Sequence, residues 1–199
     1  ILEKAHETID HFPKLAHKSL ANQLLPFIKN DKREVYVRKI VFEIAAMCNQ
    51  RDLQDDIVEV IFDDEENLPI KIEAARCILT IGDNDTKKRL TALLSEKYLK
   101  DDVEDQLRGL TLMSLWPENI SAQELFAHIQ IPKKDNFVGA YHMFLSYNVS
   151  EHLNVEDLPV ALEWVTQQDD RCQFYPAVEK LADSIMRKAW YNINEPGIL

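Results

Sequence analysis

Residues 70–81 read IKIEAARCILTI, and the apolar positions of this segment recur along the chain at a spacing of 33 residues. Ile70, Ala74 and Cys77 are separated by four residues and then three, which places them on one face of an α-helix. The same pattern occurs 33 residues earlier and 33 residues later, at Val37, Val41, Ile44, Val103, Leu107 and Leu110.

A second apolar set lies between the members of the first. It steps by 33 through Leu24, Ile57, Leu90 and through Ile28, Ile61, Leu94, and then by 35 to Leu125 and Ile129. Two helices in each period of this length are typical of an α-solenoid, in which each unit packs only on its neighbours. The sequence therefore predicts an all-α, right-handed α-solenoid of some nine or ten helices, with little or no strand.

The regular spacing is lost after Pro132. We expect residues 1–130 to form the helical repeats and residues 131–199 to form an irregular helical extension packed on the end of the solenoid. Helices are predicted over 1–12, 15–28, 33–48, 53–62, 70–81, 85–98, 101–116, 121–129, 136–147, 154–165 and from 176 onward.

Local signals mark several helix boundaries. Pro26 predicts a kink or a late start of its helix, and Pro69 suits a first turn, where a missing N–H costs nothing. Gly82 is the expected C-terminal cap, and Asp85 the expected N-terminal cap of the next helix. Ser121 with Glu124 three residues later predicts a capping box. We expect the loop 63–67 to be too charged to bury.

The charge of the chain limits its partners. Its 199 residues carry a formal net charge of −11 and a pI near 5.0, which disfavours binding to nucleic acid and to anionic membrane surfaces. No run approaches the ~18 apolar residues that a membrane span needs. Three scattered cysteines favour buried thiols in a reducing compartment, so we expect a cytoplasmic protein. The chain begins with Ile1, which favours a piece of a longer chain.

No pattern of catalytic or metal-ligating residues emerges. His6 and Asp10 share a helix face, but His11 falls one residue beyond the spacing of a His-Glu-x-x-His zinc motif. Acid pairs such as Asp63-Asp64 and Asp169-Asp170 are explained by solubility and capping, and Cys172 has no base nearby. We therefore predict no catalytic residue, metal or cofactor.

Residues 72–79, followed by Ile81-Gly82-Asp83, resemble HEAT repeats, which often read Val-Arg-x-x-Ala-x-x-x-Leu and end in a Gly-Asp turn. The segment with Leu115-Trp116-Pro117, Glu124-Leu125-Phe126 and Gly139-Ala140-Tyr141 is similar to the helical region downstream of the ATPase in large bacterial NACHT-type (STAND) NTPases. The second resemblance implies a region that senses a ligand or partner and controls an ATPase. This chain has no Gly-x-x-x-x-Gly-Lys-Ser/Thr motif of its own.

In a HEAT-type solenoid, the second helix of each pair lines the concave face. We expect a protein partner to bind there, through Asp55, Asp56, Glu59 and Lys88, with modest affinity and electrostatic steering. Acids and bases that are 33 residues apart could pair across repeats: Asp55 with Lys88, Asp56 with Arg89, and Glu43 with Arg76.

The aromatic-rich C-terminal part offers a competing site around Tyr141 and Tyr147. Seven aromatic residues crowd there, and they could form either a larger core or a partner groove: Trp116, Phe126, Phe137, Tyr141, Phe144, Tyr147 and Trp164. Gly139-Ala140 would let another helix approach closely in either case.

Three functions remain open from the sequence. The leading hypothesis is a non-enzymatic interaction or sensor segment of a larger bacterial protein. The alternatives are a HEAT-like enzyme domain acting on nucleic acid, which the net charge disfavours, and a purely structural spacer. The oligomeric state is left open.

Overall fold

The computed structural model describes residues 11–29, 34–134, 137–168 and 175–194, and throughout these ranges the regular structure is helical, with no strand. The prediction of an all-α protein is confirmed at this level, while the right-handed solenoid stays a prediction. The chain divides into two compact units, residues 1–89 and 90–199. Within the described ranges, no helix has both the length and the apolar character needed to cross a membrane.

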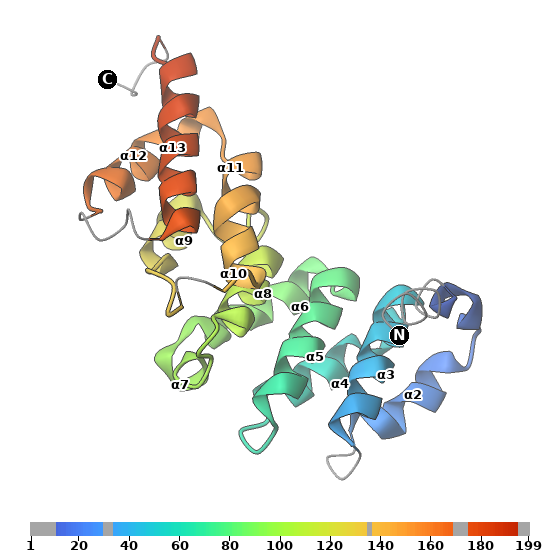
Figure 1. The fold of residues 1–199 in the computed structure, drawn as a ribbon. Helices are drawn as coiled ribbons and strands as arrows, with labels where there is room; N and C mark the ends of the chain where they lie inside the picture. Colours follow the sequence, from blue (N-terminus) through green and yellow to red (C-terminus); the bar gives the residue numbers. More distant parts are fainter. Residues whose placement is uncertain (1–10, 30–33, 135–136, 169–174, 195–199) are drawn as a thin grey trace. The chain divides into compact units, whose positions relative to one another are not determined.

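The first unit has its helices in two layers. The α3 helix (Val35–Met47) packs beside α5 (Leu68–Ile81), and α2 (Leu20–Ile28) packs beside α4 (Gln54–Phe62), with contacts between the layers (Figure 1). Short 3₁₀ turns at Phe12–Leu15 and Arg51–Leu53 and the short α6 (Asn84–Arg89) complete the unit.

These boundaries follow the sequence signals closely. Pro69 lies in the first turn of α5, as predicted, whereas Pro26 lies inside α2 and that helix begins late, at Leu20. Residues 1–10, which include most of the helix predicted over 1–12, lie outside the described residues.

The apolar repeat supplies much of the core of this unit, but two of its positions on α3 differ: Ile44 is only half-buried, and Val37 is exposed. Every member of the second set within this unit is buried, as are Ile70, Ala74, Cys77 and Val41. Val37, in contrast, is 36% exposed, and its neighbour Arg38 is buried in its place at 2%. The buried face of α3 is therefore made by Arg38, Val41, Phe42 and Ala45.

An ion pair explains why an arginine is buried there. Arg38 Nη2 lies 2.6 Å from a carboxylate oxygen of Glu66 and donates a 2.8 Å hydrogen bond to the carbonyl oxygen of Ile28. The Glu66 side chain is only 4% exposed, so the expectation that the whole loop 63–67 stays exposed is wrong. The opposite charge of Arg38 makes burial of Glu66 tolerable, and the arginine also satisfies a carbonyl at the end of α2.

The turn after α5 also differs in detail from the prediction. Gly82 does cap α5, but in an extended conformation (φ −63°, ψ 136°) rather than a left-handed one. A Cβ at this position would lie 2.7 Å from the carbonyl oxygen of Ile78, so the close approach requires glycine. The residue that caps α6 is Asp83 rather than Asp85, because Asp83 Oδ1 accepts a 2.8 Å hydrogen bond from the backbone N–H of Thr86. That bond, with one from Gln54, holds the pKa of Asp83 below its ordinary value.

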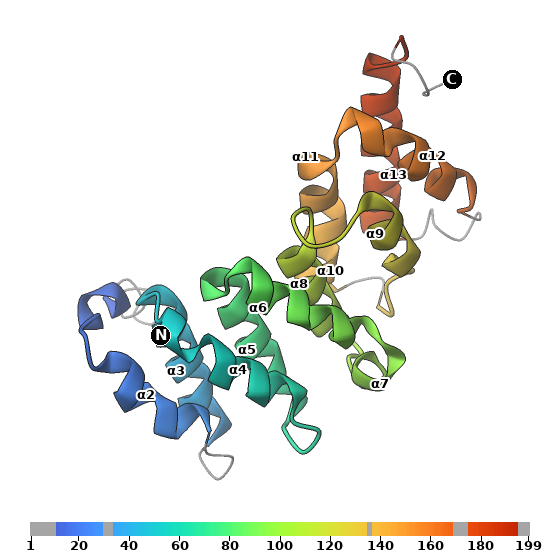
Figure 2. The same ribbon diagram turned by 180° about the vertical axis from the view of Figure 1, so that it is seen from behind.

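The second unit is built from shorter elements. Its helices are α7 (Glu96–Leu99), α8 (Gln106–Leu115), α9 (Ala122–His128), α10 (Ala140–Met143), α11 (Val149–His152), α12 (Leu158–Thr166) and α13 (Pro176–Tyr191) (Figure 2). A π-helical turn, Phe144–Asn148, joins α10 to α11, and 3₁₀ turns occur at Leu90–Leu94 and Val155–Asp157. The single helix predicted over 85–98 is therefore broken into separate turns.

One apolar core joins the elements of this unit from Leu112 to Ala189, so the predicted domain boundary at residue 130 falls inside it. The Ser121–Glu124 capping box of α9 is present, and α13 begins at Pro176; both predictions are confirmed.

A network of buried charged groups fixes the start of α8. Asp102 is 1% exposed, and its two carboxylate oxygens accept 2.9 Å hydrogen bonds from the backbone N–H groups of Gln106 and Arg108. Asp105, in the left-handed conformation at φ 50°, accepts from the Lys133 N–H at 2.7 Å and lies 3.2 Å from Arg108 Nε. Burial raises the pKa of Asp102, against the opposing effect of the hydrogen bonds.

The α8 and α10 helices approach each other closely where they cross. A Cβ on Gly109 would lie 2.2 Å from the backbone nitrogen of Tyr141 and 2.4 Å from the carbonyl carbon of Ala140. The prediction that Gly139-Ala140 lets another helix approach closely is thus correct for Ala140, which lies against α8. The glycine at the crossing itself is Gly109 of α8.

We predict that Arg38→Met destabilises the first unit by about 3–5 kcal/mol, because it leaves the buried Glu66 carboxylate without its counter-charge. The double variant Arg38→Met/Glu66→Leu should recover most of this loss. Urea titration followed by far-UV circular dichroism measures the change. All three tryptophans lie in the second unit, so their fluorescence reports separately on that unit. Equal losses in the single and double variants would contradict this account.

We also predict that Gly109→Ala destabilises the second unit by about 1–3 kcal/mol, as overpacking does. Helix propensity alone would favour alanine by about 1 kcal/mol, so the sign of the effect separates the two influences. Tryptophan fluorescence during thermal unfolding is the measurement. Gly139→Ala is the matched control, with a smaller expected loss, because its Cβ would meet side-chain atoms of Gln106 and Phe137 that can move. A higher melting temperature for Gly109→Ala would rule out the close crossing.

Candidate functional site

The acidic residues predicted as a partner surface lie on α4 and already have partners. Asp56 and Glu59 both approach Lys29 of α2, at 2.5 and 3.4 Å, and Asp55 pairs with Arg89 of α6 at 2.5 Å. These contacts join neighbouring helices, and exposed pairs of this kind contribute about 0–1 kcal/mol each. The acids on this surface are therefore largely neutralised within the unit.

Two of the predicted cross-repeat pairs are replaced by other contacts among the described residues. Arg89 contacts Asp55 rather than Asp56, because Asp56 is held by Lys29. Lys88 lies on the exposed side of α6. Arg76 contacts Glu73 of its own helix at 3.2 Å, so no ion pair between Glu43 and Arg76 forms among the described residues.

Five of the seven aromatic residues in the predicted cluster form core rather than a groove, while Phe137 is half-buried. Trp116, Phe126, Tyr141, Phe144 and Trp164 are all buried. The Tyr141 hydroxyl donates to the carbonyl oxygen of Gln130 at 2.7 Å and accepts from the N–H of the same residue at 2.9 Å. Burial raises the pKa of Tyr141 well above its ordinary value. Tyr141 is therefore a core residue, and this burial corrects the expectation that it belongs to an exposed binding surface.

Tyr147 has a different environment. It is 51% exposed, and Lys180 Nζ lies 3.6 Å from the centre of its ring, a cation–π contact with α13. Of the two tyrosines named from the sequence, only this one remains accessible.

A groove lies between α3 and α5 in the first unit, with a volume of about 570 Å³. We call it the α3–α5 groove. Volumes of roughly 300–1,000 Å³ are usual for binding sites. Its lining residues come from both helices: Tyr36, Lys39, Ile40, Phe42, Glu43, Ala46, Met47, Glu73, Arg76, Cys77 and Thr80.

The helical period explains which residues line the groove. Tyr36, Ile40, Glu43 and Met47 are spaced by four, three and four residues, so they form one stripe along α3. At about 100° per residue, that stripe lies roughly opposite the buried face centred on Val41. The apolar members of the stripe are therefore not needed for the core of the unit.

These residues leave apolar surface accessible. Ile40, Ala46 and Met47 are half-buried, and Tyr36 is 72% exposed. This stripe lies outside the 33-residue repeat, so the repeat does not predict it. A signal for it is present in the sequence, because Tyr36, Ile40 and Met47 are further apolar residues of α3 at helical spacing.

The groove has a buried floor and charged walls. Phe42 and Cys77 are each 1% exposed, and burial raises the pKa of Cys77 to about 12, which keeps the thiol protonated and unreactive. On the α5 wall, Glu73 lies 3.7 Å from Lys39 and 3.2 Å from Arg76. Glu43, on the opposite wall, is half-buried and forms no ion pair with any described residue.

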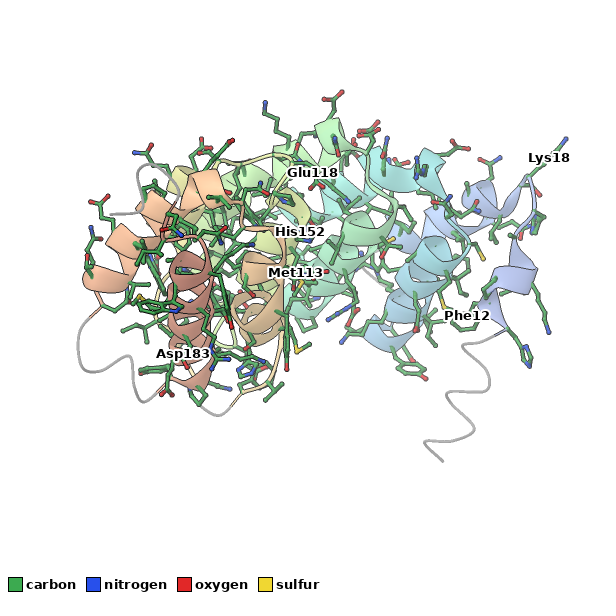
Figure 3. All side chains as sticks on the ribbon, turned by 90° about the horizontal axis from the view of Figure 1, so that it is seen from above. Phe12, Lys18, Met113, Glu118, His152 and Asp183 are labelled. Atoms are coloured by element: carbon green, nitrogen blue, oxygen red, sulfur yellow. The ribbon has the colours of Figure 1, made fainter. Side chains whose placement is uncertain are left out.

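Two other surface features are smaller. A hollow of about 170 Å³ lies between α9 and α12, over the rings of Phe126 and Trp164. On α13, Met186 and Trp190 are exposed at 52% and 72%, beside the exposed Asp183, which Figure 3 labels on that helix.

No group of three His, Cys, Asp or Glu residues suited to a metal occurs in the described ranges. His6, Asp10, Asp169, Asp170 and Cys172 lie outside those ranges.

Comparison with known proteins adds no relative to this description. No family model matches the chain, and neither a curated protein nor a solved structure matches it. The α3–α5 groove is therefore interpreted from its own residues and geometry.

We predict that substitution of the two tyrosines destabilises the second unit to different extents. Tyr141→Phe should lower the free energy of unfolding of the second unit by about 1–3 kcal/mol, because the backbone N–H and the backbone C=O of Gln130 each lose their hydrogen bond to the Tyr141 hydroxyl. Tyr147→Ala should cost less than about 1 kcal/mol, the value of an exposed cation–π contact. Urea titration with tryptophan fluorescence compares them, and a larger loss for Tyr147→Ala would contradict the burial pattern.

Proposed function

We propose that this chain is a non-enzymatic protein-interaction segment and that the α3–α5 groove is its docking site. The observation that supports the proposal is the apolar stripe of α3 that faces away from the core. Ile40 and Met47 extend the accessible apolar surface that begins at the exposed Tyr36. Contiguous accessible apolar surface with a charged rim is characteristic of interaction sites.

The residue types suit recognition of another protein. Tyrosine is enriched among the residues that carry most of the binding energy at interfaces, and Tyr36 lies on the rim of the groove. Methionine adapts its shape to different partners, and Met47 lies at the other end. Lys39, Glu43, Glu73 and Arg76 supply a polar rim, as in typical interfaces.

The wider context belongs to the same proposal. We infer that the helix pairs are HEAT-like, and that the segment serves a larger, cytoplasmic bacterial protein of the NACHT type, in which it would sense a partner. The paired helices of the first unit and the 33-residue repeat support the first inference, and the short motifs of the second unit support the other. The groove favours an interaction role over that of a structural spacer.

The test is a selection of 12–20-residue peptides from a display library on the immobilised chain. Selected peptides should lose at least about tenfold in affinity for Ala46→Trp, which fills the groove, and should also weaken with Tyr36→Ala. The combined reversal Asp55→Lys/Asp56→Lys/Glu59→Lys is the control, since those residues lie on α4. Circular dichroism verifies that each variant is folded.

If every selected peptide bound the groove variants normally and lost affinity for the α4 reversal, the docking site would be the α4 surface instead. A selection without any groove-sensitive binder would refute the role of the groove.

A further inference from the structure

The walls of the α3–α5 groove indicate which kind of protein segment it takes. This inference rests on the proposed function and concerns the same groove. From its shape and its charges, we infer that the occupant is an amphipathic α-helix of about three turns that presents a lysine or arginine to Glu43.

The length of the occupant follows from α3. Tyr36 and Met47 are eleven residues apart, which corresponds to about 16 Å along a helix. A helix of about three turns matches this distance, and apolar side chains at positions i, i+4 and i+11 would contact Tyr36, Ile40 and Met47 in turn.

A helical occupant is favoured over an extended one by hydrogen bonding. The backbone groups of α3 and α5 bond within their own helices, so the groove has no free strand edge with which an extended peptide could pair. An extended segment would leave N–H and C=O groups unpaired against Ile40, Ala46 and Met47, at a cost in free energy. A helix satisfies these groups internally and presents only side chains.

The charges of the groove set the polarity of the occupant. Glu73 is shared between Lys39 and Arg76, which brings both cations of the groove to one carboxylate. Glu43 has no such partner in the described part of the chain, and it is half-buried beside Ile40 and Met47. A base on the occupant would neutralise Glu43 where water is partly excluded and the interaction is strongest.

The charge of the whole chain acts in the same direction. A net charge of −11 attracts a basic segment from a distance and raises its association rate, an effect that salt weakens. That long-range attraction is not specific to the groove, so a test of the inference must separate it from the local contact with Glu43.

A charge-swap experiment makes that separation. Two synthetic 14-residue helical peptides carry the same leucines at i, i+4 and i+11 and differ in one residue on the flank of that stripe, Lys in one and Glu in the other. Fluorescence anisotropy measures the binding of each peptide to the full chain. We expect the Lys peptide to bind at least about tenfold more tightly than the Glu peptide, and Glu43→Gln to remove most of that difference.

The reversal Glu43→Lys should invert the preference, so that the Glu peptide becomes the tighter ligand. Asp52→Lys is the matched control, because it makes the same change in net charge at an exposed residue outside the groove lining, and it should leave the preference for Lys intact. A preference that shifts equally in both variants would show long-range attraction only and would overturn the contact with Glu43.

The outcomes also separate this inference from the proposed function. Peptides that lose binding to Ala46→Trp but show the same affinities for the Glu43 variants as for the original chain would refute the basic-helix inference. The groove would then still be a docking site. Binding of both peptides that is unaffected by Ala46→Trp would place them outside the groove and count against both.

Discussion

The buried ion pair between Arg38 and Glu66 is the interaction on which the organisation of the first unit depends. It joins the end of α2, the first turn of α3 and the loop before α5 through one guanidinium group. A buried charge with a counter-charge in place is tolerated, whereas the same charge alone costs several kcal/mol. The pair therefore restricts α3 to rotations that bring Arg38 to the interior.

That rotation has a consequence on the opposite side of α3. With Arg38, Val41, Phe42 and Ala45 inward, the helical period turns Tyr36, Ile40, Glu43 and Met47 away from the core. Had Val37 been the inward residue, as the 33-residue pattern implies, the outward stripe would be displaced by about 100°. The composition of the α3–α5 groove is thus linked to a salt bridge on the far side of the helix. A structural contact and a candidate recognition surface are coupled by one rigid element.

The second unit solves the problem of buried polarity in another way. Asp102 and Asp105 receive backbone N–H groups from the start of α8 and from Lys133. Asp105 also lies 3.2 Å from Arg108 Nε, so this site combines backbone hydrogen bonds with an ion pair. The resulting anchor positions Gly109 at the crossing with α10, where the backbone of Tyr141 is close enough to exclude any side chain. Tyr141 in turn holds Gln130. The aromatic residues are core here because short, irregular helices need large side chains to fill the space between them.

Much of the local structure could be predicted from the sequence, because its causes lie within a few residues. The capping box at Ser121, the proline starts of α5 and α13, and the apolar period that makes helices are all short-range effects. The sequence also identified Leu24, Ile28, Ile57 and Ile61 as core, because the second apolar set of the 33-residue repeat places an apolar residue at each of these positions. These features determined an all-helical chain with paired helices in its first unit.

Only the tertiary structure decided how the helices are rotated and which charges meet. Val37 and Arg38 are adjacent, and either could face inward until Glu66, 28 residues away in the chain, supplies a counter-charge. The ion pairs of α4 are a second example: Lys29 pairs with Asp56, and Arg89 therefore pairs with Asp55. Tyr141 is a third, because a helical pattern alone cannot assign it to the core or to the surface. The groove between α3 and α5 exists only once both helices are packed. Pairing between distant residues depends on the relative positions of their helices, and a periodic pattern in one segment carries no information about those positions.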